Sequence, residues 1–324
     1  MARLNMVEAL NMALREEMER NNRIVILGED VGKEGGVFRV TDGLQQKFGA
    51  DRVIDTPLAE SGIVGVALGM ALNGLRPVAE IQFEGFLYPC LDQISNHLGR
   101  MRNRSRGRFT CPVVIRFPYG GGIHAPEHHS DSPEAILAHI PGIKVVIPST
   151  PYEAKGLLLS CLRDPDPVLF MEPKRIYRAI REEVPEGDDA IPLGKAKVVQ
   201  EGKDVTVIAY GAMVREVVSA SEKLKGEASL EIIDLRTISP MDVDAMVASI
   251  RKTGRGVVVH EAPKTCGLGA EIIALINEKA LFSLQAPIER VTGFDIPVPL
   301  MKSEHYYLPN PERIVSAVKK VMSA

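Results

Sequence analysis

The stretch DTPLAESGIVGVALGMALNGLRPVAEIQF, residues 55–83, sets the pattern for the whole chain. Its middle part, residues 61–73, is apolar and rich in small residues, which predicts a tightly packed helix. That helix carries three glycines that let a neighbouring backbone approach closely, namely Gly62, Gly65 and Gly69. The end of the stretch, PVAEIQF at 77–83, predicts a short buried strand. A helix followed by a buried strand is the repeating unit of a parallel α/β sheet.

The same alternation extends to both sides of this stretch. In the first half of the chain, further strands are expected at 23–28, 111–117, 143–148 and 167–171. After residues 172–203, which are rich in Pro, Gly and charge, strands are again expected at 204–211, 229–235, 256–260 and 288–293. The sequence therefore predicts an α/β fold with two parallel-sheet domains, residues 1–185 and 204–324, joined by a linker at 186–203. In such sheets, binding sites lie beyond the carboxyl ends of the strands.

Composition excludes several classes of protein. The 324 residues carry 39 Lys and Arg against 42 Asp and Glu, a net charge of −3, so no overall field favours nucleic acid or a membrane surface. The four cysteines form no C-x-x-C pair, which argues against a zinc site or a disulfide framework. The first 20 residues lack the features of a signal peptide, and no apolar run approaches the roughly 18 residues of a membrane span. A cytoplasmic protein is expected.

Glu60 is the first candidate functional residue. It stands between the apolar residues 56–59 and the glycine-rich helix. An acid at a helix start often only complements the helix dipole. Its apolar setting, however, would raise the proton affinity of the carboxyl by desolvation, as a proton-exchanging group requires.

A histidine pair, His128 and His129, is the second candidate. It lies in the Gly-rich segment 119–132 that follows an expected strand, and Asp131 is nearby. Histidine is the commonest general acid or base near neutral pH. Together with His124 the pair could suggest a metal site, but no carboxylate or cysteine pattern accompanies it. A loop histidine without a catalytic role is the simpler alternative.

Two other motifs carry less weight. The sequence GLGAEI at 267–272 begins like a dinucleotide fingerprint but has Ile272 where the last glycine belongs, so we interpret it as a helix start. Five arginines alternate between 100 and 108, without interleaved aromatic residues that could stack on bases. They favour a structural or partner-facing loop over a nucleic-acid patch.

Taken together, several segments resemble one family. They are GEDVGKEGGVFRVTDGL (28–44), the stretch at 55–83, HHSDSPEAILAHIPGIKVVIPSTPYEAKGLL (128–158), EPKRIYR (172–178), IDLRTISPMDVD (233–244) and HEAP (260–263). They look like the beta subunit of the thiamin diphosphate-dependent 2-oxoacid dehydrogenase, in order and over nearly the whole chain. The resemblance implies a transketolase-like pyrimidine-binding domain followed by a transketolase C-terminal-type domain.

The resemblance also implies roles for individual residues. The family's cofactor-activating glutamate matches Glu60, which would exchange a proton with ring N1′ of thiamin diphosphate. The positions around the aminopyrimidine match Leu58, Gln82 and Phe86. The family's active-site histidine, expected to assist acyl transfer to lipoyl, matches His129, and its neighbour His128 leaves open which imidazole acts.

An absent motif implies a partner. The family holds the cofactor diphosphate on Mg²⁺ through GDG followed by NN, whereas this sequence has only TDG at 41–43, GDD at 187–189 and NN at 21–22. A separate alpha subunit is therefore expected to hold Mg²⁺ and the diphosphate, in an α2β2 heterotetramer. The family further implies a dihydrolipoyl acyltransferase core as a partner and a potassium site involving Cys161, Asp164 and Asp166.

The expected substrate class rests on residues 138–161 and 170–178. They look more like the branched-chain enzyme, which acts on 3-methyl-2-oxobutanoate, than like the pyruvate or acetoin enzyme, which is the alternative. A scaffold that docks the acyltransferase without catalysis is a further hypothesis.

Overall fold

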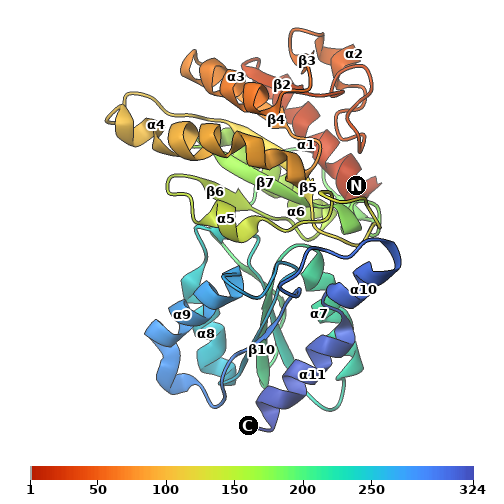
Figure 1. Ribbon diagram of the computed structural model, residues 1–324, viewed down its shortest axis with the longest axis vertical. Helices are drawn as coiled ribbons and strands as arrows, with labels where there is room; N and C mark the ends of the chain where they lie inside the picture. The colour runs from red at the N-terminus through yellow and green to blue at the C-terminus, as the bar shows by residue number, and fades with distance from the viewer. Residues whose placement is uncertain (1) are drawn as a thin grey trace. The chain divides into compact units, whose positions relative to one another are not determined.

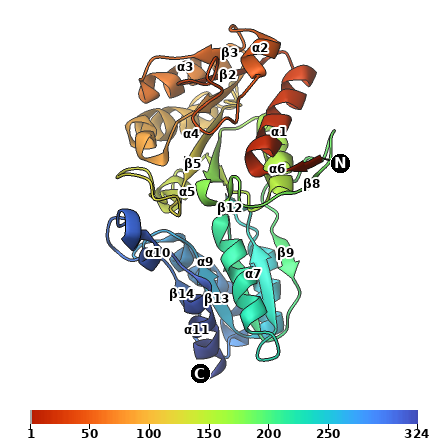
Figure 2. The same cartoon turned by 90° about the vertical axis from the view of Figure 1, so that its right-hand side faces the viewer.

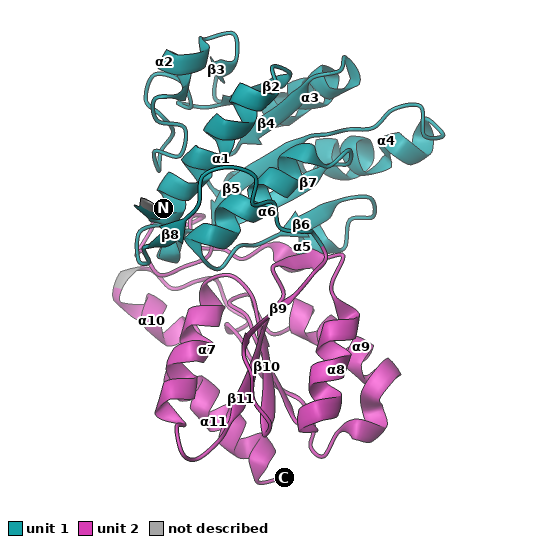
Figure 3. Cartoon of the chain, turned by 180° about the vertical axis from the view of Figure 1, so that it is seen from behind, with its two compact units in different colours: residues 1–119, 136–193 teal, residues 120–135, 194–324 magenta. Residues whose placement is uncertain are grey.

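The computed structural model describes residues 2–324, with the side chains of Ala2 and Met301 outside the description. The chain divides into two compact units, residues 1–119 with 136–193 and residues 120–135 with 194–324 (Figure 3). The division at 193/194 falls inside the expected linker. Unlike the expected division, it groups residues 120–135 with the second unit.

Unit 1 is built on six parallel strands in the order β6-β7-β5-β4-β2-β3. They are β2 (Ile24–Gly28), β3 (Val53–Asp55), β4 (Arg76–Glu80), β5 (Val114–Tyr119), β6 (Lys144–Val146) and β7 (Val168–Pro173). A separate antiparallel pair joins β1 (Ala2–Leu4) to β8 (Glu182–Val184). The central strands β2, β5 and β7 are buried throughout, as parallel strands covered on both faces must be.

Helices cover both faces of this sheet (Figures 1 and 2). On one face lie α1 (Met6–Arg20) and α6 (Pro151–Arg163), and on the other α3 (Glu60–Leu72), the π-helical η2 (Gln93–Leu98) and α4 (Gly99–Arg104). The remaining helical segments are α2 (Leu44–Phe48), η1 (Glu84–Cys90), η3 (Lys174–Ile176) and α5 (Glu134–Ala138), which begins in the segment assigned to unit 2. Residues 84–104 thus form three consecutive short helical segments, η1, η2 and α4.

Unit 2 repeats the same plan with a five-stranded sheet in the order β14-β13-β10-β11-β9, in which β9 alone is antiparallel. Its strands are β9 (Lys197–Gln200), β10 (Val205–Ala209), β11 (Leu230–Asp234), β13 (Gly256–Val259) and β14 (Glu289–Val291), and β12 (Thr237–Ser239) follows β11. Helices α7 (Ala212–Lys223) and α11 (Pro311–Met322) cover one face, and α8 (Val243–Thr253) and α9 (Leu268–Ala280) the other (Figures 1 and 3). The short turns are η4 (Leu281–Ser283), η5 (Met301–Ser303) and α10 (Glu304–Tyr307). Two mostly parallel α/β units confirm the predicted fold class.

Local sequence explains where the helices begin. Asn5 and Glu8 form a reciprocal capping box at the start of α1. Asn310 accepts a hydrogen bond from the backbone of Arg313 and precedes Pro311 at the first position of α11. Among residues 2–324, no helix combines the length and the apolar character needed to cross a bilayer.

Candidate functional site

Polar side chains gather in unit 1 where two neighbouring strands end. Glu29 and Asp30 directly follow β2, and Gln82 follows β4, which pairs with β2 in parallel register. The Gln82 side-chain amide donates to Oδ2 of Asp30 over 2.9 Å. Because the carboxyl ends of parallel strands meet at one edge, side chains 52 residues apart in the chain come together.

Glu60 joins this edge as the first residue of α3, and its side chain is half-buried. No side chain caps the start of α3. Glu29, only 7% exposed, lies close enough to Glu60 for their charges to interact. Burial raises the pKa of Glu29 above its usual range, and the negative charges of Glu60 and Asp30 raise it further.

Glu29 is a site residue that sequence reasoning missed. Its Oε1 atom is buried and has no hydrogen-bond partner, although a buried carboxylate oxygen normally has one. The available signal was its position directly after a buried strand, which is where parallel sheets place their functional groups. This orphaned oxygen shows that the site offers an unused polar contact.

The apolar residues expected around Glu60 do not all enclose it. Leu58 is 80% exposed and Phe86 half-buried. The Phe86 ring packs edge-on against Phe83 with centroids 6.2 Å apart. Leu58 and Phe86 therefore present apolar surface near the edge that carries Glu60, rather than sealing that carboxyl within the chain.

The residues at this edge fit an aminopyrimidine ring. A carboxylate at Glu60, an amide at Gln82, the aromatic face of Phe86 and the exposed Leu58 side chain match a flat, polar ring with hydrogen-bonding edges and two faces. The orphaned Glu29 oxygen adds a further acceptor in the same neighbourhood.

A buried ionic network joins the neighbouring strands β4, β5 and β7 of the same sheet. Arg116 on β5 donates to both carboxylate oxygens of Glu172 over 2.7 and 2.6 Å, and it also contacts Glu80 at the end of β4. The Tyr177 hydroxyl donates to Glu172 over 2.5 Å. All of these side chains are buried, so mutual hydrogen bonding must offset the cost of removing charges from water.

A second buried ion pair fixes the turn that carries Phe86. Lys174 Nζ lies 2.9 Å from both carboxylate oxygens of Glu84, the first residue of η1, and both side chains are fully buried. The same ammonium lies 5.5 Å from the centroid of the Phe83 ring. These contacts hold Phe83 and Phe86 in place by charge as well as by packing.

His129 lies in the other unit, in the loop at 120–135 (Figure 3). Its side chain is half-buried, whereas His128 is exposed and has a left-handed backbone, φ 65°. Nδ1 of His129 lies 2.7 Å from the carbonyl oxygen of Glu127. A carbonyl can only accept, so Nδ1 carries the proton and Nε2 is the basic nitrogen of the neutral ring. This orientation suits His129 rather than His128 to proton transfer.

The structure thus brings together Glu60, Glu29, Asp30 and Gln82 in unit 1, while His129 belongs to unit 2. Its unit also holds a buried pair in which the Tyr210 hydroxyl donates to Glu134 over 2.9 Å. Burial raises the pKa of Glu134 to about 8, and it lowers to about 4 the pKa of His260, whose ring stacks on Tyr210 with centroids 6.4 Å apart. Neither residue was singled out from the sequence, because nothing local shows that a charged residue type is buried.

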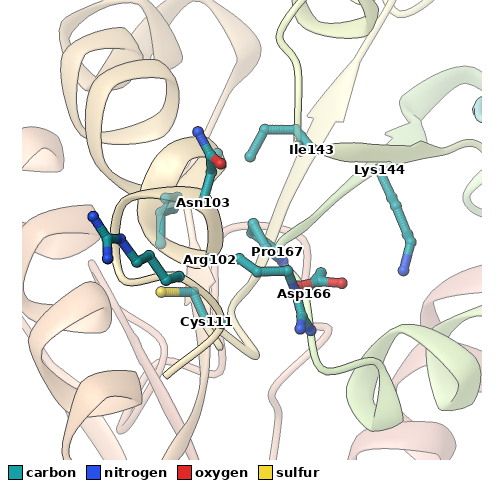
Figure 4. Close-up of a pocket in the computed structure, with 12 residues that line it drawn as sticks. Arg102, Asn103, Cys111, Ile143, Lys144, Asp166 and Pro167 are labelled. Atoms are coloured by element: carbon teal, nitrogen blue, oxygen red, sulfur yellow. The ribbon is translucent and has the colours of Figure 1, made fainter. Parts of the chain in front are cut away.

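The segment of the expected potassium site already contains ion pairs. Lys144 Nζ lies 2.6 Å from both carboxylate oxygens of Asp164, and Arg102 Nε lies 2.7 Å from Asp166. Asp166, Arg102 and Lys144 line a cavity of about 680 Å³ together with Cys111 (Figure 4). Cys161 is buried at the end of α6. Within residues 2–324, no three His, Cys, Asp or Glu side chains cluster closely enough to hold a metal ion.

Comparison with known families defines the class of protein. Residues 2–179 match the transketolase pyrimidine-binding domain, and residues 194–314 match the transketolase C-terminal domain. These two matches cover both units of the fold and include Glu60 and His129. The protein is therefore transketolase-like, a class that depends on thiamin diphosphate.

Within this class, the chain belongs to the family of 2-oxoacid dehydrogenase beta subunits. It is 56% identical to the pyruvate dehydrogenase E1 component subunit beta of Acholeplasma laidlawii over 325 residues, which cover 100% of this chain and 99% of that protein. Identity to the subunits of the same name from Bacillus subtilis and Staphylococcus aureus is 53% and 52%, each over 99% of both chains.

A solved structure confirms the fold independently. A chain described as a split gene transketolase, inactive beta4 tetramer, superimposes with a TM-score of 0.81 over 99% of both chains. Its sequence is only 24% identical, so the match shows a shared fold.

Proposed function

We propose that this chain is the beta subunit of the decarboxylating component of a pyruvate dehydrogenase complex, which oxidatively decarboxylates pyruvate and reductively acetylates lipoyl. The observation that carries the proposal is the joining of Glu60, the orphaned Glu29 carboxyl and Gln82 at the carboxyl edge of two parallel strands. The branched-chain substrate favoured by sequence segments is less well supported than the pyruvate alternative, because the relatives at 52–56% identity carry the pyruvate name.

The chain's own residues would bind and activate the cofactor at this edge. When bound, thiamin diphosphate supplies a nucleophilic carbon and an electron sink for decarboxylation. Glu60 would hold a proton and exchange it at N1′ of the aminopyrimidine. Gln82, Phe86 and Leu58 would orient the ring, and the Glu84–Lys174 ion pair, which anchors the turn that carries Phe86, would keep that orientation constant.

His129 would act in acyl transfer to lipoyl. Its Nδ1 proton is held by the Glu127 carbonyl, so Nε2 can give or take the proton that the lipoyl sulfur exchanges. The lipoyl group would come from the dihydrolipoyl acyltransferase core.

A separate alpha subunit is part of the proposal. The exposed side of α3 is a stripe of Gly62, Val66 and Gly69, with Val66 53% exposed. A side-chain carbon at Gly69 would meet no atom of this chain within 4 Å, so packing within the chain does not require the glycine. This stripe and the exposed Leu58 would be covered by the alpha subunit in an α2β2 assembly, which would complete the desolvation of Glu60 and hold Mg²⁺ on the cofactor diphosphate. Potassium near Cys161, Asp164 and Asp166 remains a further proposal.

Reconstitution with the alpha subunit, thiamin diphosphate and Mg²⁺ tests the function. Pyruvate, 3-methyl-2-oxobutanoate and acetoin are compared as substrates by kcat/KM, and we expect pyruvate to be preferred. Preference for 3-methyl-2-oxobutanoate would refute the pyruvate assignment.

The role of Glu60 is tested in the same enzyme. Glu60→Gln should lower kcat at least roughly 100-fold, within the range of a lost general acid–base group, while the assembled tetramer still binds thiamin diphosphate. The matched control is Glu312→Gln, which changes an exposed glutamate of α11 paired with Lys223 and should leave kcat unchanged. Full activity in Glu60→Gln would support the non-catalytic scaffold instead.

A further inference from the structure

The loop that carries His129 is attached to unit 2 by carboxylates that come from distant parts of the sequence. Glu304 of α10 accepts hydrogen bonds from the backbone N–H groups of Gly122 over 2.7 Å and His124 over 3.0 Å. The Nδ1 atom of His124 lies 3.2 Å from the same carboxylate. The Glu304 side chain is only 2% exposed, so these bonds are shielded from competing water.

Three further contacts hold the same loop. Glu261, which follows β13, accepts from the backbone N–H of Gly121 over 3.0 Å. The backbone N–H of Gly120 donates to the carbonyl of Asp131 over 2.9 Å, which closes the base of the loop. At the C-terminal end of the loop, Glu134 accepts a hydrogen bond from the Tyr210 hydroxyl.

His129 lies midway between these attachments. It lies five positions after His124 and five positions before Glu134. Its backbone N–H donates to the carbonyl of Pro126 over 3.2 Å, and its Nδ1 atom lies 2.7 Å from the carbonyl oxygen of Glu127, so both of these contacts lie within the loop. The bonds that hold the backbone at residues 121–124 therefore limit how far the part of the loop that carries His129 can move within unit 2.

We propose that Glu304 is a positioning residue for His129, which fixes the imidazole for acyl transfer by binding the backbone of its loop. The proposal rests on the acyl-transfer role given to His129 above. Glu304 differs from the other attachments because one carboxylate engages two backbone N–H groups and an imidazole at once. Both oxygens act as acceptors, and only a carboxylate offers two such oxygens.

The variant Glu304→Gln tests this geometry with little change in volume. Its amide can accept one of the two backbone N–H groups, but its NH₂ group then faces the other donor. A misplacement of about 1 Å in a catalytic group can cost up to about 100-fold in rate, so a loss of roughly tenfold is expected for a loosened loop. Glu304→Asp keeps two acceptor oxygens on a shorter side chain and should recover part of the loss.

Two assays on the assembled α2β2 enzyme separate positioning from general damage. Reductive acetylation of a lipoyl domain requires His129 on this proposal, whereas decarboxylation with ferricyanide as electron acceptor bypasses the lipoyl group. Glu304→Gln should lower kcat of the first roughly tenfold and change the second less than about twofold. Glu312→Gln, which removes an exposed carboxylate that touches no part of the loop, is the matched control.

A double-mutant cycle shows whether Glu304 acts through His129. In the His129→Ala background, Glu304→Gln should cause no further loss of reductive acetylation, because the group that it positions is gone. An equal tenfold loss in that background, or an equal loss with ferricyanide, would overturn the proposal. Wild-type reductive acetylation in His129→Ala alone would refute the role of His129, which is a different failure.

Hydrogen exchange gives a readout that does not depend on activity. Amides of residues 121–131 should exchange faster in Glu304→Gln than in the wild-type tetramer, while those of β10 and β13 keep their rates. Unchanged exchange in 121–131 would overturn the proposal even if activity fell. If Glu304→Gln fails to assemble, Glu304→Asp carries the same comparison, with smaller losses in the same direction.

Discussion

Replacing Glu134 with Gln should stabilise unit 2 at neutral pH. The Glu134 side chain is fully buried, its Oε1 accepts the Tyr210 hydroxyl over 2.9 Å, and its Oε2 has no hydrogen-bond partner. Burial raises the pKa of Glu134 to about 8 from its ordinary value of 4.5. Near neutral pH the folded protein therefore holds a proton on Glu134 that the unfolded chain releases.

The sign and size of the effect follow from this difference in bound protons. An acid whose pKa is higher in the folded than in the unfolded protein costs no stability below its unfolded pKa. Above that pKa it lowers the free energy of unfolding progressively, until the pH reaches its folded pKa. At about 1.4 kcal/mol per pH unit, the cost to the wild type near pH 7 is on the order of 3 kcal/mol. Gln keeps the acceptor for Tyr210 and removes the proton, and its buried amide costs on the order of 1 kcal/mol. The net gain is about 2 kcal/mol near pH 7.

Urea unfolding of the purified chain at several pH values measures this gain. The sequence has no Trp, so far-UV circular dichroism is the direct probe. Relative to wild type, Glu134→Gln should gain most near pH 8 and be slightly less stable near pH 4.5, where the unfolded chain also begins to hold the proton and only the cost of the buried amide is left. A constant difference at all pH values, or a loss of stability that grows with pH, would refute the reasoning.

The control variant, Glu312→Gln, should change stability with pH in the opposite direction to Glu134→Gln. The hydrogen bond from Lys223 lowers the pKa of the exposed Glu312. Its small contribution is therefore present above its unfolded pKa and lost on acidification, so Glu312→Gln should never gain stability as the pH rises.

Three further predictions concern buried charge, backbone and thiols. Lys174→Met should destabilise the chain by about 3–5 kcal/mol, because it leaves the Glu84 carboxylate buried without its cation, and adding Glu84→Gln should recover at least half of the loss in urea unfolding. Gly120→Ala should lower stability by about 1–2 kcal/mol, measured by thermal unfolding, because φ is +82° and the added carbon would lie 2.8 Å from Glu261 Oε2. Among the four cysteines only Cys266 is exposed, so maleimide should label one thiol in the native chain and four after unfolding, as counted by mass spectrometry.

The fold could be predicted because its strands can be recognised from short stretches of sequence. RIVILG (23–28) and CPVVIRF (111–117) are short, mostly apolar runs of the kind that predicts a buried strand, and they overlap the buried strands β2 and β5 of unit 1. The assignment of residues 120–135 to unit 2 could not be predicted in this way. It depends on Glu261 and Glu304, which lie 140 and 182 residues further along the chain than the amides they bind.

The candidate site was predictable only in part, for a related reason. Apolar neighbours in sequence predict a desolvated Glu60, but Leu58 extends into solvent in this chain, so adjacency in sequence does not establish enclosure. Glu29 acquires its raised pKa from burial and from Glu60, a residue 31 positions away. Glu84 and Lys174 are likewise fully buried in the folded core. Residue type alone predicts the opposite, because Glu and Lys side chains are usually exposed.

In the proposed assembly, the glycines of α3 would affect the stability of a chain that has not yet bound its partner. Glycine in a helix interior costs roughly 1 kcal/mol relative to alanine, and the 13-residue α3 contains three of them. If the chain assembles with an alpha subunit as proposed, a newly made chain without that partner would expose a helix of low intrinsic stability and the stripe of Gly62, Val66 and Gly69, which chaperones and proteases can recognise. We expect surplus beta subunits to be degraded faster than assembled ones, so that the glycines help to match the abundance of the two subunits after translation.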